Sequence, residues 1–287
     1  MSAKDARITM DHTANYPPLS QWELDGAAIS KKAAKDGMVL LRNRAHALPL
    51  TPGAICLFGN GAARTVRGGT GSGDPFNGGL SGGGDVHVDL SPRYHIQLLP
   101  AMQKAGFTVL TEEMLLRIGE RFDEGLRRME NRVMSSFTLP EEAMSEAAAR
   151  AYAAGTDTAI YVISRNSGEG TDRAVEDDYN LTQTEKENLA LLRSCFRTLI
   201  LLLNVGGPVC VADLEEADPD AILLMGQGGQ EGGEAAAEVL TGATNPSGKL
   251  TAVTGCIEKT GSPADWSRGS ALLCCIYFVP RSATPFT

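Results

Sequence analysis

The sequence predicts an α/β protein, a three-layer α/β/α sandwich built on a mainly parallel sheet. Continuous apolar runs over residues 159–164, 199–205 and 221–225 alternate with segments of helical pattern. Strands without polar alternation are buried on both faces, and such strands belong to parallel sheets that are covered by helices. The 287 residues, 43% of them hydrophobic, can bury a core of this kind.

The first half of the chain begins with a polar N-terminal arm, expected over residues 1–25. Helical patterns predict helices at 25–35, 94–105, 111–131 and, after Pro140, 141–154. Short apolar runs predict strands at 38–41, 54–58 and 107–110. Residues 59–85 are so rich in glycine that we expect a loop there.

The second half has clearer helix boundaries. Thr182 followed by Glu185 forms a capping-box pattern, which predicts a helix from Thr182 to about Phe196. A further helix is expected over residues 230–240, closed by Gly242. The buried strand positions predict a core that includes Ile55, Leu57, Ile160, Val162, Leu201, Leu203, Ile222 and Leu224.

Residues 254–287 depart from this pattern, because helical and strand periods both fade there. Two interpretations stay open: an edge strand with a loose tail, or an atypical tail that does not belong to the fold. We expect residues beyond about Gly255 to pack poorly, so that their removal changes the melting temperature little. The sandwich domain itself is expected over residues 26–253.

Composition excludes several classes of function. The net charge is −9 and no basic stretch could follow a phosphate backbone, so no nucleic-acid partner is expected. Residues 1–17 lack a signal-peptide pattern and no apolar run could cross a bilayer, so we expect no membrane partner and a cytoplasmic location. The six cysteines form no CxxC pair and the four histidines lack ligand spacing, so neither a metal nor a cofactor is expected.

The most informative stretch is residues 165–173, which directly follow a buried apolar run. Ligand sites of open α/β sheets gather at the carboxyl ends of strands, and glycines on both sides of Glu169 let the loop project that carboxylate. Neighbouring carboxylates such as Asp172 tend to raise the pKa of such a group, which suits a general acid. The alternative is an ordinary polar loop in which Arg173 and an aspartate form an ion pair.

A second stretch, residues 67–74, places a glycine-rich run between Arg67 and Asp74. The backbone N–H groups of such a loop can face an anion or a hydroxyl, although no P-loop motif follows. The run Gly59-Asn60-Gly61 faintly matches a dinucleotide-binding turn, which keeps a nucleotide-binding α/β domain as a minor alternative. A third stretch, residues 230–235, opens a helix. Either this helix start faces a ligand, or its small residues let the helix pack closely against a strand. We favour the second interpretation.

Several motifs occur in one order along the chain and together resemble a known family. They are residues 34–43 and 48–50, the glycine-rich loop at 68–73, Ser167-Gly168-Glu169-Gly170 with Asp172-Arg173, Asn204-Val205-Gly206-Gly207-Pro208-Val209, and residues 229–233 and 245–250. Over residues 26–253 the chain resembles the α/β sandwich, or C-terminal-type, domain of family 3 glycoside hydrolases. The motifs begin near the start of the chain, which is similar to the subgroup with a swapped domain order.

The resemblance implies a retaining β-glucosidase in which a TIM-like barrel supplies an aspartate nucleophile and Glu169 is the acid/base. Arg67, Asp74, Asp172 and Arg173 would then help to bind a β-glucoside or related oligosaccharide. A barrel takes roughly 250 residues, so we expect none in this chain and no activity of the chain alone. The alternative is a non-catalytic carbohydrate-binding or interaction module on the same fold.

Overall fold

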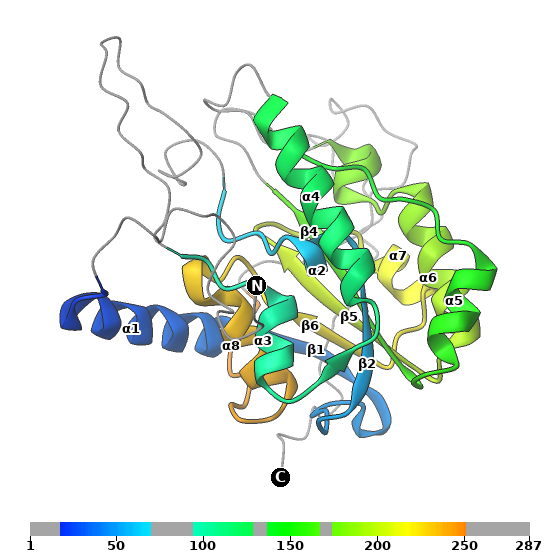
Figure 1. Ribbon diagram of the computed structural model, residues 1–287. Coiled ribbons are helices and arrows are strands. Elements are labelled where there is room, and N and C mark those ends of the chain that lie inside the picture. The colour runs from blue at the N-terminus through cyan, green and yellow to red at the C-terminus, as the bar shows by residue number, and fades with distance from the viewer. Residues whose placement is uncertain (1–17, 70–93, 129–136, 167–173, 251–287) are drawn as a thin grey trace, which may run out of the picture.

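A six-stranded sheet forms the centre of the computed structural model, which describes residues 18–69, 94–128, 137–166 and 174–250 (Figure 1). The strands follow the order β1-β6-β5-β4-β2-β3, and all neighbours pair in parallel except β1 and β6. The sheet is therefore mainly parallel, as predicted. Its strands are β1 Val39–Asn43, β2 Ala54–Phe58, β3 Thr108–Val109, β4 Thr158–Arg165, β5 Thr198–Val205 and β6 Ala221–Leu224.

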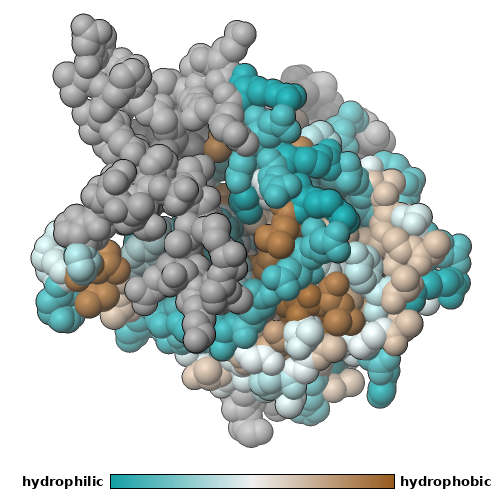
Figure 2. All heavy atoms as spheres, viewed as in Figure 1, coloured by the Kyte–Doolittle hydropathy of each residue, from teal (hydrophilic) through white to brown (hydrophobic). Residues whose placement is uncertain are grey.

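Helices cover both faces of the sheet and complete the predicted sandwich. The first face is covered by α1 Gln21–Gly37, α2 Asn60–Ala63, α3 Leu98–Lys104, α4 Glu112–Arg128 and α8 Gly232–Leu240. The second face is covered by α5 Glu146–Ala153, α6 Gln183–Cys195 and α7 Val211–Glu216. Short helical turns occur at Arg44–His46, Val175–Tyr179 and Gly229–Glu231. The outer surface of α4 is largely hydrophilic, as amphipathic packing requires (Figure 2).

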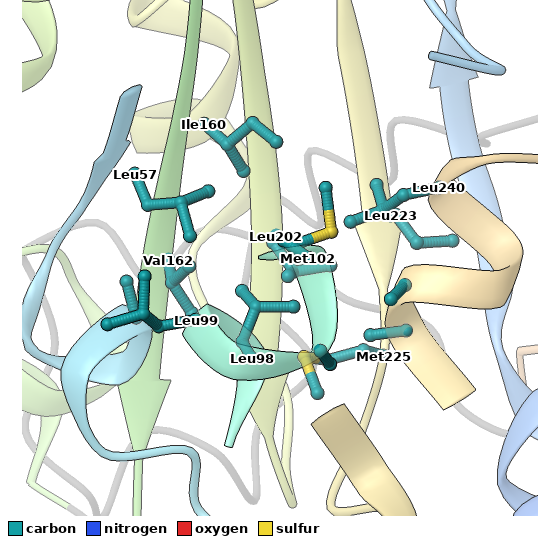
Figure 3. Close-up of a cluster of buried hydrophobic side chains, with 14 of the residues drawn as sticks. Leu57, Leu98, Leu99, Met102, Ile160, Val162, Leu202, Leu223, Met225 and Leu240 are labelled. Carbon is teal, nitrogen blue, oxygen red and sulfur yellow. The ribbon is translucent and has the colours of Figure 1, made fainter. Parts of the chain in front are cut away.

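Two hydrophobic cores lie on the two faces, because successive side chains of a strand point to opposite sides. On β4, Ile160 and Val162 join the first core beside α3 and α8 (Figure 3). Tyr161 and Ile163 of the same strand join the second core. Seven of the eight predicted core residues are buried. Leu224 was expected among them but is only partly buried, because it lines a cavity between α7 and the edge strand β1.

Helices α1, α5 and α6 each begin directly after a residue that caps the helix N-terminus. The capping box of α6 is confirmed: the Thr182 N–H donates to Glu185 Oε2 (2.8 Å), and the Glu185 N–H donates to Thr182 Oγ1 (3.1 Å). Helix α1 begins at Gln21, inside the range expected to be irregular, because Ser20 forms a capping box of its own. Helix α5 begins later than expected, at Glu146, where the Ser145 side chain caps it.

The glycines that faintly match a dinucleotide-binding turn have a packing role. Gly59 has a φ of 84°, and a Cβ there would overlap the Val162 carbonyl oxygen of β4. A Cβ at Gly61 would meet the side chains of Val162 and Ser164. Both glycines let the turn after β2 lie directly against β4, so their presence needs no nucleotide.

Candidate functional site

The stems of both candidate loops, the residues where each loop leaves the folded sheet, lie at the carboxyl edge of the parallel strands. The fully buried Asn204, near the end of β5, accepts the Val66 N–H (2.6 Å) and donates to the Val66 carbonyl (2.8 Å). Arg67 follows in the chain, and its carbonyl accepts the N–H of Gly229 beyond β6 (2.9 Å). The stretch with the candidate acid/base leaves the sheet at Arg165, the last residue of β4. Both stems therefore lie where ligand sites of α/β sheets gather.

Four of the five candidate residues lie outside the described residues: Glu169, Asp74, Asp172 and Arg173. Arg67 is described and is half-buried. The roles assigned to these residues from the sequence stay predictions. What the structure describes is the framework from which their loops depart.

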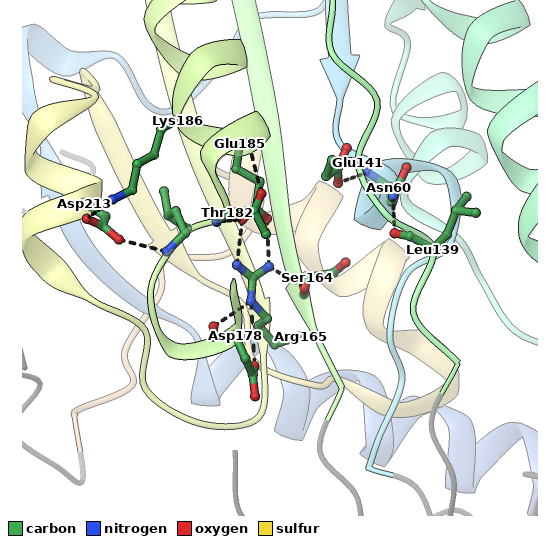
Figure 4. Close-up of polar contacts among 11 residues, drawn as sticks. Asn60, Leu139, Glu141, Ser164, Arg165, Asp178, Thr182, Glu185, Lys186 and Asp213 are labelled. Carbon is green, nitrogen blue, oxygen red and sulfur yellow. Dashed lines mark hydrogen bonds and ion pairs between the residues drawn. The ribbon is translucent and has the colours of Figure 1, made fainter. Parts of the chain in front are cut away.

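A buried guanidinium fixes both ends of the segment that contains Glu169 (Figure 4). The two terminal nitrogens of Arg165 donate to the two carboxylate oxygens of Glu185, each at 2.7 Å. Its Nε donates to the carbonyl of Asp178, also at 2.7 Å. Because Arg165 precedes the segment and Asp178 follows it, the ends of the segment lie one hydrogen bond apart. Burial disfavours the charge of Arg165, but the carboxylates of Glu185, Asp178 and Glu141 together outweigh this, so the pKa of the guanidinium is raised.

The residues after Asp178 are held by a second carboxylate. Asp213 of α7 accepts the Leu181 N–H (2.8 Å) and pairs with Lys186 of α6 (2.7 Å). The Cys210 N–H donates to the Tyr179 carbonyl (2.8 Å). The returning end of the segment is therefore anchored to two helices. Sequence reasoning missed these contacts, since nothing in the sequence pairs residues so far apart.

Glu141 is a half-buried carboxyl group at this edge. It accepts the Asn60 N–H at 2.7 Å, at the turn after β2. Burial raises the pKa of Glu141 to about 7, the Asn60 hydrogen bond opposes this rise, and the Glu185 carboxylate adds to it. The sequence placed residue 141 in a helix. The structure instead places it in an irregular stretch, from which its side chain reaches the end of the sheet.

The helix start at residues 230–235 packs as the favoured interpretation expected. Glu231 is buried and accepts the hydroxyl proton of Tyr94 (2.5 Å). A Cβ at Gly233 would overlap the backbone of Ile96 and Gln97, so the glycine permits close approach of α8. The adjacent His95 is also buried. Burial, and then the charges of Arg67 and Arg64, lower its pKa to about 3, which leaves the imidazole neutral.

Metal and membrane features were searched over the described part of the chain. No group of three or more His, Cys, Asp or Glu side chains in those ranges could hold a metal ion. No helix among the described residues is long and apolar enough to cross a membrane.

Comparison with known proteins gives a consistent result. Residues 38–257 match the model of the glycosyl hydrolase family 3 C-terminal domain. The chain is 33% identical over 257 residues to β-glucosidase A of Butyrivibrio fibrisolvens, covering 78% of this chain and 28% of that protein. It is 31% identical to a β-glucosidase of Ruminococcus albus, covering 79% of this chain and 23% of that protein.

Solved structures agree. The structure of β-glucosidase 3B from Thermotoga neapolitana in complex with α-D-glucose is 35% identical, with a TM-score of 0.67, covering 88% of this chain and 34% of that one. A β-glucosidase from Paenibacillus barengoltzii is 26% identical with a TM-score of 0.68, covering 84% of this chain and 25% of that one. The chain thus spans about a third or less of the length of these relatives.

Proposed function

The chain belongs to glycosyl hydrolase family 3, whose C-terminal domain it carries, and we propose that it supplies the general acid/base of a retaining β-glucosidase. Glu169 is the proposed acid/base, and the nucleophile is proposed to come from a TIM-like barrel domain. The substrate class is inferred from the relatives, which are named β-glucosidases.

In the proposed reaction Glu169 acts twice. It first donates a proton to the leaving glycosidic oxygen while a barrel carboxylate attacks the anomeric carbon. The ionised Glu169 then takes a proton from the water that releases the sugar. Such retention requires the two carboxyl groups to lie about 5–5.5 Å apart. Arg67, Asp74, Asp172 and Arg173 are proposed to bind the sugar from this side.

One observation supports this proposal above the others. The segment that contains Glu169 leaves the sheet at Arg165 and returns at Asp178, and one buried guanidinium holds both points. A general acid needs a constant position relative to the leaving oxygen. A loop whose two ends are held together at the carboxyl edge of the sheet can keep its side chains in such a position.

The test is hydrolysis of aryl β-glucosides by the purified chain, alone and mixed with a barrel domain from a β-glucosidase relative. We expect no turnover by the chain alone, because general acid–base catalysis contributes about 10²–10⁴-fold and cannot replace a nucleophile. In the active mixture Glu169→Gln should slow the hydrolysis of glucosides with poor leaving groups most. Glucosides with activated leaving groups need less protonation of the departing oxygen and should be affected less.

The matched control is Asp177→Asn, which changes an exposed carboxylate of the same segment and should leave the rates unchanged. Turnover by the chain alone that vanishes with Glu169→Gln would contradict the two-domain mechanism. Glucose binding with no turnover in any mixture would favour a non-catalytic carbohydrate-binding module instead.

A further inference from the structure

A cavity of about 450 Å³ lies on the second face of the sheet, beside the edge strand β1. Three neighbouring strands supply six apolar residues of its lining: Val39, Leu41, Leu203, Val205, Ile222 and Leu224. Helices α5 and α6 do not line it, and only Leu214 of the short α7 reaches it. All five residues of β1 are only half-buried. Helices therefore cover this edge of the sheet less completely than its centre.

The described part of the chain runs into this cavity. Lys249 and Leu250 belong to its lining, and Leu250 is 41% exposed. Just before them, the Gly248 N–H donates to the Met38 carbonyl at 2.9 Å. A side chain at residue 248 would overlap the Gly37 and Met38 carbonyl oxygens, so only glycine lets the two backbones approach this closely. The chain therefore reaches the cavity alongside the start of β1.

We propose that residues 251–255 occupy this cavity as an extended segment beside β1. Because Gly248 lies beside Met38, an extended chain places Lys249 and Leu250 beside the start of β1, and residues 251–255, about 17 Å long, continue along its remainder and past its end. The segment Thr-Ala-Val-Thr-Gly carries no charge, and valine and threonine favour extended structure. Among the described strands β1 has a neighbour on one side only, and such an edge offers its free backbone groups to a further strand. With the period of two, Ala252 and Thr254 fall on the same side as Leu250, toward the cavity.

Two variants of the full chain test this occupant. Ala252→Glu should force a charge into the apolar cavity, displace the segment and increase the fluorescence of the dye ANS, which binds exposed apolar surface. Ala264→Glu, the same change beyond the proposed segment, should leave the fluorescence at the level of the unaltered chain. Equal fluorescence of the two variants would overturn the proposal. So would strong ANS binding by the unaltered chain, because the cavity would then be open to another protein.

Shortened chains provide a second measurement. Amide hydrogen exchange over residues 38–43 should be equal in the full chain and in a chain that ends at Gly255. It should be about ten-fold faster in a chain that ends at Leu250, because β1 loses its cover. If the chain ending at Gly255 already exchanges faster than the full chain, the occupant lies beyond it, for example in the apolar residues 271–279. The proposal for residues 251–255 would then be wrong.

Discussion

The buried pair of Arg165 and Glu185 should be the most sensitive polar contact in the domain. The side chains are 11% and 2% exposed, so replacing Arg165 with methionine leaves a carboxylate buried without its partner. Breaking such a pair costs about 3–5 kcal/mol of the free energy of unfolding. For a domain of this size that corresponds to a fall in melting temperature on the order of 10 °C. Thermal unfolding followed by circular dichroism measures it.

The control for this variant is Arg150→Ala, which breaks the exposed pair with Glu146 one helical turn away. Exposed pairs contribute about 0–1 kcal/mol, so its melting temperature should hardly change. The double variant Arg165→Met/Glu185→Leu should melt between Arg165→Met and the unaltered chain, since no charge stays buried alone. If Arg165→Met melted like Arg150→Ala, the guanidinium would not anchor the segment that contains Glu169, and the main support for the proposed function would be lost.

Further predictions concern pH, backbone packing and the tail. The pKa of Glu141 is raised to about 7, so its contribution to stability is complete below the unfolded pKa near 4.5 and is lost as the pH rises through 7. Glu141→Gln should therefore stabilise the protein at pH 8 by on the order of 1–3 kcal/mol, but not at pH 4, in urea unfolding. Gly59→Ala should lower the free energy of unfolding by about 2–4 kcal/mol, because residue 59 has a positive φ and an added Cβ would overlap the Val162 carbonyl oxygen. Gly53→Ala should leave the free energy of unfolding nearly unchanged, because there is space for a Cβ at that position. Removing residues 256–287 should change the melting temperature little, and a large fall would show that the tail is part of the sheet.

The order of the strands along the chain was predictable, because the apolar runs of β2, β4, β5 and β6 are long enough to be buried strands and the shorter runs of β1 and β3 still stand out from their polar surroundings. The capping box at Thr182 and Glu185 was predictable for a similar reason, since its partners lie three residues apart. Helix α2 and helix α7 were missed, because four and six residues are too short for a helical period to show. The start of α5 was placed too early, since Pro140 and its neighbours favour a helix start that the contact of Glu141 with Asn60 replaces.

What the sequence by itself determined about this protein is local: which runs are buried, where helices are capped, and which motifs assign the chain to its family. Only the tertiary structure decided which distant groups share a site. Arg165 meets Glu185 and Asp178 through the return of the chain after β4. Asn204 of β5 joins Val66, in the stem of the glycine-rich loop, to the Gly226 carbonyl beyond β6. Leu224 is likewise only half-buried because it lines the cavity beside β1, which α5 and α6 do not cover. The physical reason is that periodicity reports the environment of one element, whereas a site and a cavity depend on how several elements pack.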